Sequence, residues 1–289
     1  MSYAYYPGCS LHSTAEEYDR SFRRVCTILG IELDELKKWV CCGSTPAHAT
    51  SHLLSIALPA HNLSIVEKSG RDEVVVPCAA CFSRFKFAQH EMEMDEELSR
   101  QVSQVIGSSM GRKVNVIHPL EVFSTRAAIP RSKVVKDLSF LKVVCYYGCL
   151  LTRPPKVTNF DTCEYPMSMD NVLRSVGIHT LDWSYKTECC GASLALTETD
   201  IVVKLVGDLL AEAKRVGADS IAVACPLCHA NLDTRQPEAE AMTGEKFDIP
   251  VFYFTQLIGL ALGCEQKELG LDKHIVDVEP HLSVLQGGV

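Results

Sequence analysis

Two adjacent cysteines constrain this chain more than any other feature, because the pair at 41–42 recurs at 189–190. Each pair is followed at almost the same distance by a C-x-x-C motif, after 35 residues in the first case and 34 in the second. A single cysteine also precedes each pair. The two sets are Cys9, Cys41, Cys42, Cys78 and Cys81, and Cys149, Cys189, Cys190, Cys225 and Cys228. The repeated spacing indicates a duplicated unit that supplies five thiols in each half.

The length of the chain suits two domains with hydrophobic cores. At 289 residues the repeat predicts one domain at 1–138 and a second at 139–289. No apolar signal segment precedes Cys9, so the 14 cysteines favour metal binding in a reducing cytoplasm over a disulfide framework. The longest apolar stretch, 249–263, is too short and too interrupted to span a membrane. A net charge of −8, with basic residues mixed among acidic ones, disfavours a nucleic-acid partner.

Strands and helices alternate in both halves. Short apolar runs predict buried strands at Tyr3–Tyr6, Val74–Val76, Val114–Ile117, Val143–Tyr146, Ile221–Ala224 and Val251–Tyr253. Helical periodicity follows most of them, and glycines close several of these segments. The alternation predicts an α/β fold with two similar Rossmann-like domains, each with a parallel sheet, related by pseudo-twofold symmetry.

Four local expectations follow from the same patterns. Residues 13–16 have a capping-box sequence and are expected to open a helix. A long helix is expected over about 49–69, with a kink at Pro59. The segment Arg153–Lys156 is too proline-rich for a helix. Beyond Leu271 the tail has little pattern and is expected along the surface or on a partner.

The cysteine-bearing loops are expected to meet at one edge of each sheet. In an open α/β sheet, ligands gather at the carboxyl ends of the strands, where the single cysteine and the C-x-x-C follow predicted strands. Cysteines three apart on the first turn of a helix share a face, and the helix N-terminus favours an anionic centre. This arrangement suits an iron–sulfur cluster.

Five thiols per half exceed what simpler metal sites need. A zinc site takes four ligands, and an ordinary cubane cluster takes four cysteines. An adjacent cysteine pair is a poor disulfide and directs its thiolates along different vectors, so it can reach two irons. We therefore expect the ten repeated cysteines to be cluster ligands. Of the other four, Cys26 and Cys264 are expected to fill the core. Cys145, in a strand, and Cys163, in a loop outside the repeat, are expected not to contact a cluster.

The double cysteine pattern resembles the duplicated CCG domain of the B-type subunit of heterodisulfide reductase over most of the chain. The resemblance implies that each set of five binds one noncubane [4Fe-4S] cluster, and that all ten cysteines take part in catalysis through these clusters. It also implies reductive cleavage of a disulfide of the coenzyme M–coenzyme B type. Electrons would come from an iron–sulfur partner of the C type and a flavin-containing partner of the A type, with flavin only on the partner.

Three residues are candidates for binding or protonating such a substrate. His48 lies six residues beyond Cys42, from where an imidazole can deliver a proton to a product thiolate. Arg153 and Lys156 follow Cys149 and can hold the anionic end of a thiol coenzyme. Other candidates are His12 and His229 for the proton, and Arg84 and Lys86 for the anion. An ordinary solvated role is the alternative for each.

We interpret the chain as the disulfide-cleaving subunit of a larger electron-transfer complex, with substrate in the cleft between the two halves. The loop at 42–48 is more similar to bacterial relatives than to methanogen ones, which leaves the identity of the disulfide open. Related CCG modules in glycolate, lactate and glycerol-phosphate oxidising complexes make an electron-transfer subunit without a disulfide substrate the main alternative. A zinc-stapled structural module is the third.

Overall fold

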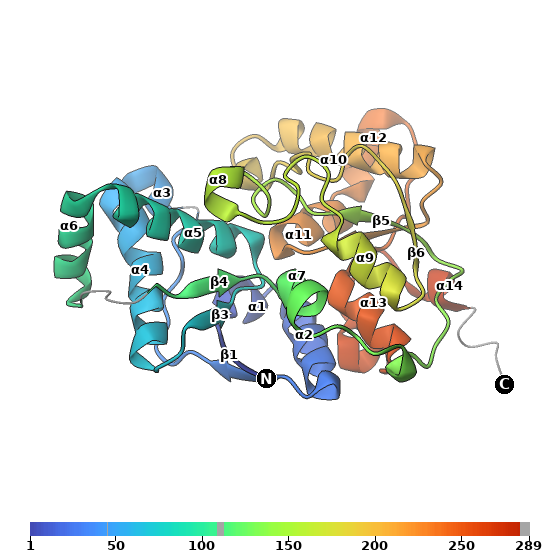
Figure 1. Cartoon of the computed structure of the whole chain (residues 1–289). Coiled ribbons are helices and arrows are strands. Elements are labelled where there is room, and N and C mark those ends of the chain that lie inside the picture. Colours follow the sequence, from blue (N-terminus) through green and yellow to red (C-terminus); the bar gives the residue numbers. More distant parts are fainter. Residues whose placement is uncertain (45, 109–112, 284–289) are drawn as a thin grey trace.

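Two parallel four-stranded sheets, one in each half, form the frame of the chain (Figure 1). The structure is a computed structural model and describes residues 1–44, 46–108 and 113–283. In the first half, β1 (Ser2–Tyr5), β2 (Glu32–Glu35), β3 (Glu73–Val75) and β4 (Asn115–Ile117) lie in the order β2-β1-β3-β4. In the second half, β5 (Lys142–Tyr146), β6 (His179–Leu181), β7 (Ser220–Val223) and β8 (Val251–Tyr253) lie in the order β6-β5-β7-β8. The shared order confirms the prediction of two similar α/β domains, and the boundary at residue 138 stays a prediction.

Helices connect the strands within each half. The first half holds α1 (Gly8–Leu11), α2 (Glu16–Leu29), α3 (Pro46–Thr50), α4 (His52–Lys68), α5 (Ala79–Met94), α6 (Glu96–Ile106) and α7 (Pro119–Glu121). The second holds α8 (Pro155–Thr158), α9 (Ser168–Ser175), α10 (Thr199–Arg215), α11 (Pro226–Thr234), α12 (Gln236–Thr243), α13 (Phe254–Ala261) and α14 (Glu279–Leu282). Short 3-10 turns lie at 131–133, 192–194, 267–269 and 271–273, and a π turn lies at 122–126.

Parallel pairing brings the cysteine-bearing loops of each half to one edge. Ala4 of β1 pairs with Val74 of β3, and Val144 of β5 pairs with Ile221 of β7. In each sheet the two central strands therefore end side by side. The segment that carries the single cysteine and the segment that carries the C-x-x-C leave the sheet at the same edge.

The predicted capping box at residues 13–16 is wrong. The helix α2 begins at Glu16, and its N-cap residue, Ala15, has no side chain able to cap it. Residues 8–11 form their own helical turn, α1, and the Ser13 hydroxyl donates a hydrogen bond of 2.8 Å to the Cys9 carbonyl. The serine therefore serves the end of α1 and is not available to the start of α2.

The helix expected over about 49–69 is present, whereas the proline-rich segment 153–156 is more helical than the sequence suggested. The helix α4 begins at His52, capped by the Ser51 hydroxyl, and continues through Pro59. The expectation that 153–156 excludes a helix is wrong at its end, because α8 begins at Pro155. Proline suits the first helical position, where the backbone has no intrahelical N–H bond to lose.

The segment after Leu271 packs along the chain itself. Val278 and Leu282 are buried against the core. The Asp233 carboxylate accepts hydrogen bonds from the backbone N–H groups of Ile275 and Val276, at 2.7 and 3.1 Å. The tail is therefore held against the rest of the chain as far as residue 283. Of the two expectations for it, this agrees with a tail that lies along the surface of the chain.

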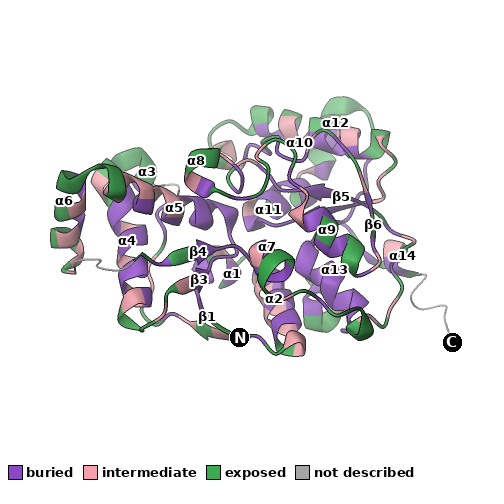
Figure 2. Cartoon of the chain, in the orientation of Figure 1, coloured by how far each residue is buried: buried purple, intermediate pink, exposed green. Residues whose placement is uncertain are grey.

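The two halves share one continuous hydrophobic core. The helices α2 and α13 lie side by side (Figure 1). All of α13 is buried, whereas α2 buries only part of its surface (Figure 2). Tyr18 stacks on Tyr253 with ring centroids 4.3 Å apart, and the Ser21 and Thr255 hydroxyls are 2.7 Å apart in a buried hydrogen bond. This packing fixes one half against the other.

None of the helices in the described ranges combines the length and the apolar character that crossing a membrane requires.

Candidate iron–sulfur site

The first set of cysteines comes from three segments that meet at the edge of the first sheet. Cys9 lies in α1, the pair 41–42 lies in the loop after β2, and the C-x-x-C lies at the start of α5. The sulfur atoms of Cys42 and Cys81 are 3.0 Å apart. Residues far apart in the sequence are therefore brought within the reach of one group.

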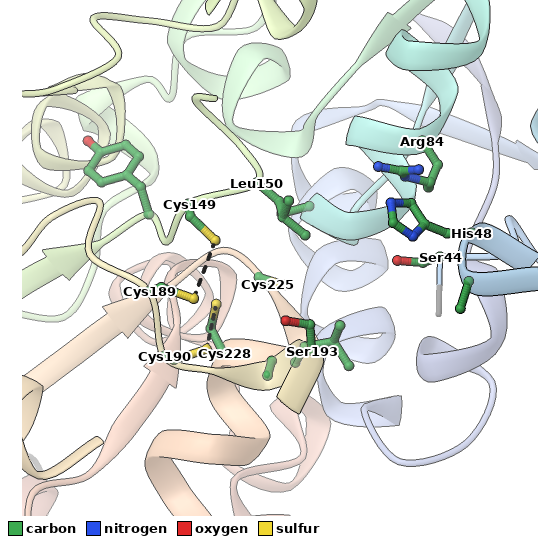
Figure 3. Close-up of a pocket in the computed structure, with 15 residues that line it drawn as sticks. Ser44, His48, Arg84, Cys149, Leu150, Cys189, Cys190, Ser193, Cys225 and Cys228 are labelled. Carbon is green, nitrogen blue, oxygen red and sulfur yellow. Dashed lines mark hydrogen bonds between the residues drawn. The ribbon is translucent and has the colours of Figure 1, made fainter. Parts of the chain in front are cut away.

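The second set repeats this arrangement, as Figure 3 shows. The sulfur atoms of Cys149 and Cys189 are 3.8 Å apart, and those of Cys190 and Cys228 are 3.7 Å apart. Backbone N–H groups point at thiols of both sets, for example Gly43 N to Cys41 Sγ at 3.4 Å and Gly191 N to Cys189 Sγ at 3.3 Å. Such contacts stabilise a thiolate.

Both C-x-x-C motifs lie at the N-terminus of a helix, as predicted. Cys78 is the N-cap residue of α5, and Cys225 is the N-cap residue of α11. Neither side chain caps its helix by a hydrogen bond. The N–H groups of the first helical turn and the helix dipole therefore remain oriented toward the negative charge that these thiols would carry.

A glycine leaves room beside the last cysteine of each set. A Cβ atom at Gly148 would lie 2.9 Å from Cys228 Sγ, and one at Gly8 would lie 3.3 Å from Cys81 Sγ. Both glycines have positive φ, +69° and +71°, which L-residues with a side chain rarely adopt. The backbone just before Cys9 therefore passes close to the Cys81 thiol, and the backbone just before Cys149 passes close to the Cys228 thiol. A side chain at either glycine would crowd the thiols of that set.

Contacts between thiols lower the pKa of at least one cysteine in each set. Hydrogen bonds from Cys41, and then from Cys81, lower the pKa of Cys42 to about 4. In the second half, a hydrogen bond from Cys149 lowers the pKa of Cys189 to about 6. The thiolate is the form that binds a metal, so these positions are prepared for metal ligation.

The first cysteines of the two C-x-x-C motifs meet where the halves join. Cys78 and Cys225 are both buried. The pKa of Cys225 lies well below the usual thiol value, first because of a hydrogen bond from Cys228 and next because of one from Cys78. The two cysteine sets are therefore adjacent in space.

The described residues do not form a site for a single metal ion. Within residues 1–44, 46–108 and 113–283, no three His, Cys, Asp or Glu side chains converge closely enough to hold one ion. A structural zinc ion needs four such ligands around one point. Each set instead offers five thiols, with N–H groups and a helix N-terminus beside them, which is a donor set that fits an iron–sulfur cluster.

Three of the four remaining cysteines lie in the hydrophobic core, and the fourth, Cys163, does not. Cys26, Cys145 and Cys264 are buried in the core. Burial raises the pKa of Cys26 to about 12 and also raises that of Cys145, so both stay as neutral thiols. Cys163 is partly exposed, and its sulfur lies 3.8 Å from a Glu164 carboxylate oxygen.

A pocket of about 400 Å³ opens beside the second cysteine set and is lined by both halves. Figure 3 shows Ser44, His48 and Arg84 on the side of the first half, across from the cysteines of the second. Its lining residues are Ser44, His48, Ala49, Ala79, Arg84, Tyr147, Cys149, Leu150, Cys189, Cys190, Ala192, Ser193, Cys225, Leu227 and Cys228. Among these described residues are all five cysteines of the second set and none of the first.

The predicted binding residues differ in their relation to this pocket. His48 lines it, as does Arg84. Arg153 does not line it, because its guanidinium pairs with Glu164 at 2.6 Å and donates a hydrogen bond to the Thr187 carbonyl.

The remaining candidates also lie away from the pocket wall. Lys156 is exposed on α8, and Lys86 is absent from the lining residues. His12 pairs with Glu35 at 3.1 Å. His229 is buried and stacks on Tyr253. The structure therefore directs attention to Arg84 for an anion and to His48 for a proton.

Sequence reasoning missed a buried ion pair behind the pocket wall. Lys186 Nζ lies 2.7 Å from Asp170 Oδ1, and both side chains are fully buried. The Tyr147 hydroxyl donates a hydrogen bond of 2.8 Å to the other Asp170 oxygen. Nothing in the local sequence pairs Lys186 with a residue on α9, so no pattern could have indicated it.

Known proteins share the duplicated cysteine unit. Residues 3–86 and 143–233 match CCG, described as a cysteine-rich domain. The 8-methylmenaquinol:fumarate reductase membrane anchor subunit of Wolinella succinogenes is 30% identical over 95% of this chain and 97% of that protein. The B-type subunit of the ferredoxin:CoB-CoM heterodisulfide reductase of Methanosarcina mazei is 26% identical over 93% of this chain and 92% of that protein.

A solved structure supports the fold alone. A hypothetical protein from Helicobacter pylori superposes with a TM-score of 0.78 at 12% identity, over 96% of this chain and 52% of that one. The present chain therefore spans about half the length of that structure. The two matched ranges have the same strand order, and each contains its own set of five cysteines. The chain therefore belongs to the CCG cysteine-rich domain family and carries two copies of the domain.

Proposed function

We propose that the chain is the B-type subunit of a heterodisulfide reductase-like complex and reductively cleaves a small-molecule disulfide. Cleavage breaks the S–S bond, takes up two electrons and two protons, and releases two thiols. The observation that carries the proposal is the pocket between the halves, where all five cysteines of the second set face the same space as Arg84 and His48. The similarity to the heterodisulfide reductase chain of Methanosarcina mazei supports this reaction class.

The two cysteine sets would each hold one noncubane [4Fe-4S] cluster. When bound, such clusters supply electrons one at a time, and two of them match a two-electron cleavage. The chain itself contributes the thiolates, the N–H groups of Gly43 and Gly191, and the N-termini of α5 and α11, all of which stabilise negative charge. An iron–sulfur partner of the C type and a flavin-containing partner of the A type would complete the complex, with the flavin on the partner.

Arg84 is the residue best placed to bind an anionic substrate. It projects from α5 and is half-buried; this burial lowers its pKa, and the charge of Cys42 acts in the opposite direction. Within the described part of the chain it forms no ion pair with a carboxylate. A guanidinium that lines a pocket and is not paired with a carboxylate in the described part of the chain suits the carboxylate, sulfonate or phosphate end of a disulfide.

His48 would complete the reaction by protonating a product thiolate. It stands on the same side of the pocket as Arg84, in the short helix α3 that follows the first cysteine pair. Its side chain is exposed, so it can exchange protons with solvent and return to its starting state. Apolar residues such as Leu150 and Leu227 line the pocket wall and limit the entry of water.

Replacing Arg84 by glutamine is expected to weaken binding of an anionic disulfide by about 1.5 to 3 kcal/mol, the range for a hydrogen bond to a charged group. Both clusters should remain, because Arg84 is not a ligand. Titration of the reduced variant with the disulfide, followed by the visible spectrum and by thiol release, measures the change. Arg153→Gln is the matched control, since Arg153 is held by Glu164 outside the pocket. Equal losses in both variants would place the anion elsewhere.

A quinol or a similar aromatic electron carrier is a second candidate for the same pocket. The apolar side chains of Leu150 and Leu227 favour it, as does the 30% identity to a subunit of 8-methylmenaquinol:fumarate reductase. In this case the chain would pass electrons without cleaving a disulfide. Arg84 then has no anionic group to bind, and Arg84→Gln should leave the affinity for a neutral quinone unchanged.

One anaerobic experiment separates the two functions. The reduced, cluster-loaded chain is mixed with a panel of anionic disulfides and, in parallel, with a water-soluble menaquinone analogue. Reoxidation of the clusters with release of two thiols per disulfide supports the proposed function. Reoxidation by the quinone alone supports the second candidate, and reoxidation by neither contradicts both.

A further inference from the structure

His118 occupies a central and fully buried position between the halves. It follows β4 and is the N-cap residue of α7. Its ring stands at right angles to Phe82 of the first half and Phe160 of the second, each 6.1 Å away between centroids. Phe254 covers it at 6.5 Å. These contacts hold the imidazole plane in one orientation.

The position of the imidazole proton follows from the hydrogen bonds. The backbone N–H of Leu120 lies 3.2 Å from His118 Nδ1 and can only donate, so Nδ1 accepts. Burial lowers the pKa of His118 to about 4, which keeps the ring neutral near pH 7. The single proton of the neutral ring is therefore on Nε2.

The Nε2–H group is shared by two carbonyl oxygens, one from each half. Pro77 O lies 2.8 Å away and Ala224 O lies 3.1 Å away. Pro77 immediately precedes Cys78, and Ala224 immediately precedes Cys225. These are equivalent places in the two halves, since each is the last residue before a C-x-x-C. One proton thus ties together the two cysteine loops at the point where their first thiols meet.

The second half has no equivalent bridge among the described residues. Tyr253 corresponds to His118, because each is the N-cap residue of the helix after the last strand of its sheet. In each case the backbone N–H donates to the side chain three residues further on, Glu121 for His118 and Gln256 for Tyr253. The Tyr253 hydroxyl is buried and has no hydrogen-bond partner. The link between the loops therefore depends on His118, and Tyr253 offers a matched position without that role.

We propose that His118 is a positioning residue that sets the separation of the two C-x-x-C loops and thereby the electronic coupling between the two bound clusters. The proposal rests on the proposed function only in that both cysteine sets hold a cluster. The Nε2–H group of His118 is directed at two backbone carbonyl oxygens, so the residue acts on the cysteine loops through their backbone. A two-electron cleavage needs electrons from both centres, so their mutual placement bears on the reaction.

The test compares His118→Phe, which keeps the ring but removes the donor, with the parent chain and with Tyr253→Phe as control. Iron content and thermal unfolding first establish that both clusters are present and that the chain is folded. EPR spectra of the fully reduced protein are then recorded at two microwave frequencies. The splitting caused by spin–spin interaction between the clusters stays constant in field units, which distinguishes it from differences in g value. We expect the splitting to be lost or narrowed in His118→Phe and unchanged in Tyr253→Phe.

A conservative variant keeps the proposal testable if His118→Phe does not fold. His118→Gln retains a side-chain N–H and should recover part of the splitting. Disulfide turnover by His118→Phe should fall about tenfold, as is usual when a residue that supports the ligands from behind is changed. A parent-like splitting in His118→Phe overturns the proposal. Loss of iron from both sets in folded His118→Phe and His118→Gln also overturns it, because His118 would then build the sites and not set their coupling. A parent chain with two coupled clusters but no turnover contradicts the proposed function alone.

Discussion

Replacing Cys42 or Cys190 by serine is expected to remove the iron of one half and leave the other half loaded. The Cys42 sulfur lies 3.0 Å from that of Cys81, and the Cys190 sulfur lies 3.7 Å from that of Cys228. Because each set is built from its own segments, each variant should hold about four iron atoms per chain where the parent holds about eight. Iron analysis, the visible spectrum and EPR of the two variants measure this.

Cys163→Ser is the control for the serine substitutions, since Cys163 is partly exposed and lies outside both sets. It should keep the iron content of the parent. Loss of all iron from Cys42→Ser or Cys190→Ser, with the fold retained, would contradict two separate sites. A colourless parent that holds zinc would favour the structural alternative over both electron-transfer functions.

Replacing Asp170 by asparagine is expected to lower the free energy of unfolding by about 3 to 5 kcal/mol, the cost of leaving one member of a buried ion pair without its partner. Lys186 is fully buried, and its ammonium group lies 2.7 Å from Asp170. Denaturant unfolding followed by tryptophan fluorescence measures the loss, since Trp183 is buried nearby and bonds to the Cys145 carbonyl at 2.9 Å.

Two further variants identify the cause of that loss. The double variant Asp170→Asn/Lys186→Met removes both charges and should be more stable than Asp170→Asn alone. Asp208→Asn breaks an exposed pair with Lys204 on α10 and should have no measurable effect. If the double variant is less stable than Asp170→Asn, the unpaired charge of Lys186 is not the cause of the loss of stability.

Local patterns were sufficient to predict the frame of the chain and the cysteine sets. Strand runs ending in cysteine-bearing loops are short-range features, and the C-x-x-C motifs do begin α5 and α11. The capping box at 13–16 failed for a reason that is also local: α1 takes up the preceding residues, and Ser13 then bonds to the Cys9 carbonyl. A four-residue motif contains no information on whether the residues before it form a helical turn of their own.

Residues whose roles depend on how the halves pack could not be predicted in this way. Arg153 and Arg84 both lie close to a cysteine in the sequence. Arg153 is turned to Glu164 of its own half, whereas Arg84 reaches a pocket lined mainly by the other half. His118 shows the same limit, because its two carbonyl partners are 41 and 106 residues away in the chain. Periodicity carries no information on such distances.

The packing of α2 on α13 bears on how a substrate arrives. Tyr18 and Tyr253 stack at 4.3 Å, and Ser21 and Thr255 are joined by a buried hydrogen bond, so opening the halves like a hinge would break a close-packed joint. Enzymes that close two domains over a substrate are often limited in rate by that motion. We therefore expect the pocket to keep its shape, and substrate to exchange with it by diffusion, without a conformational gate.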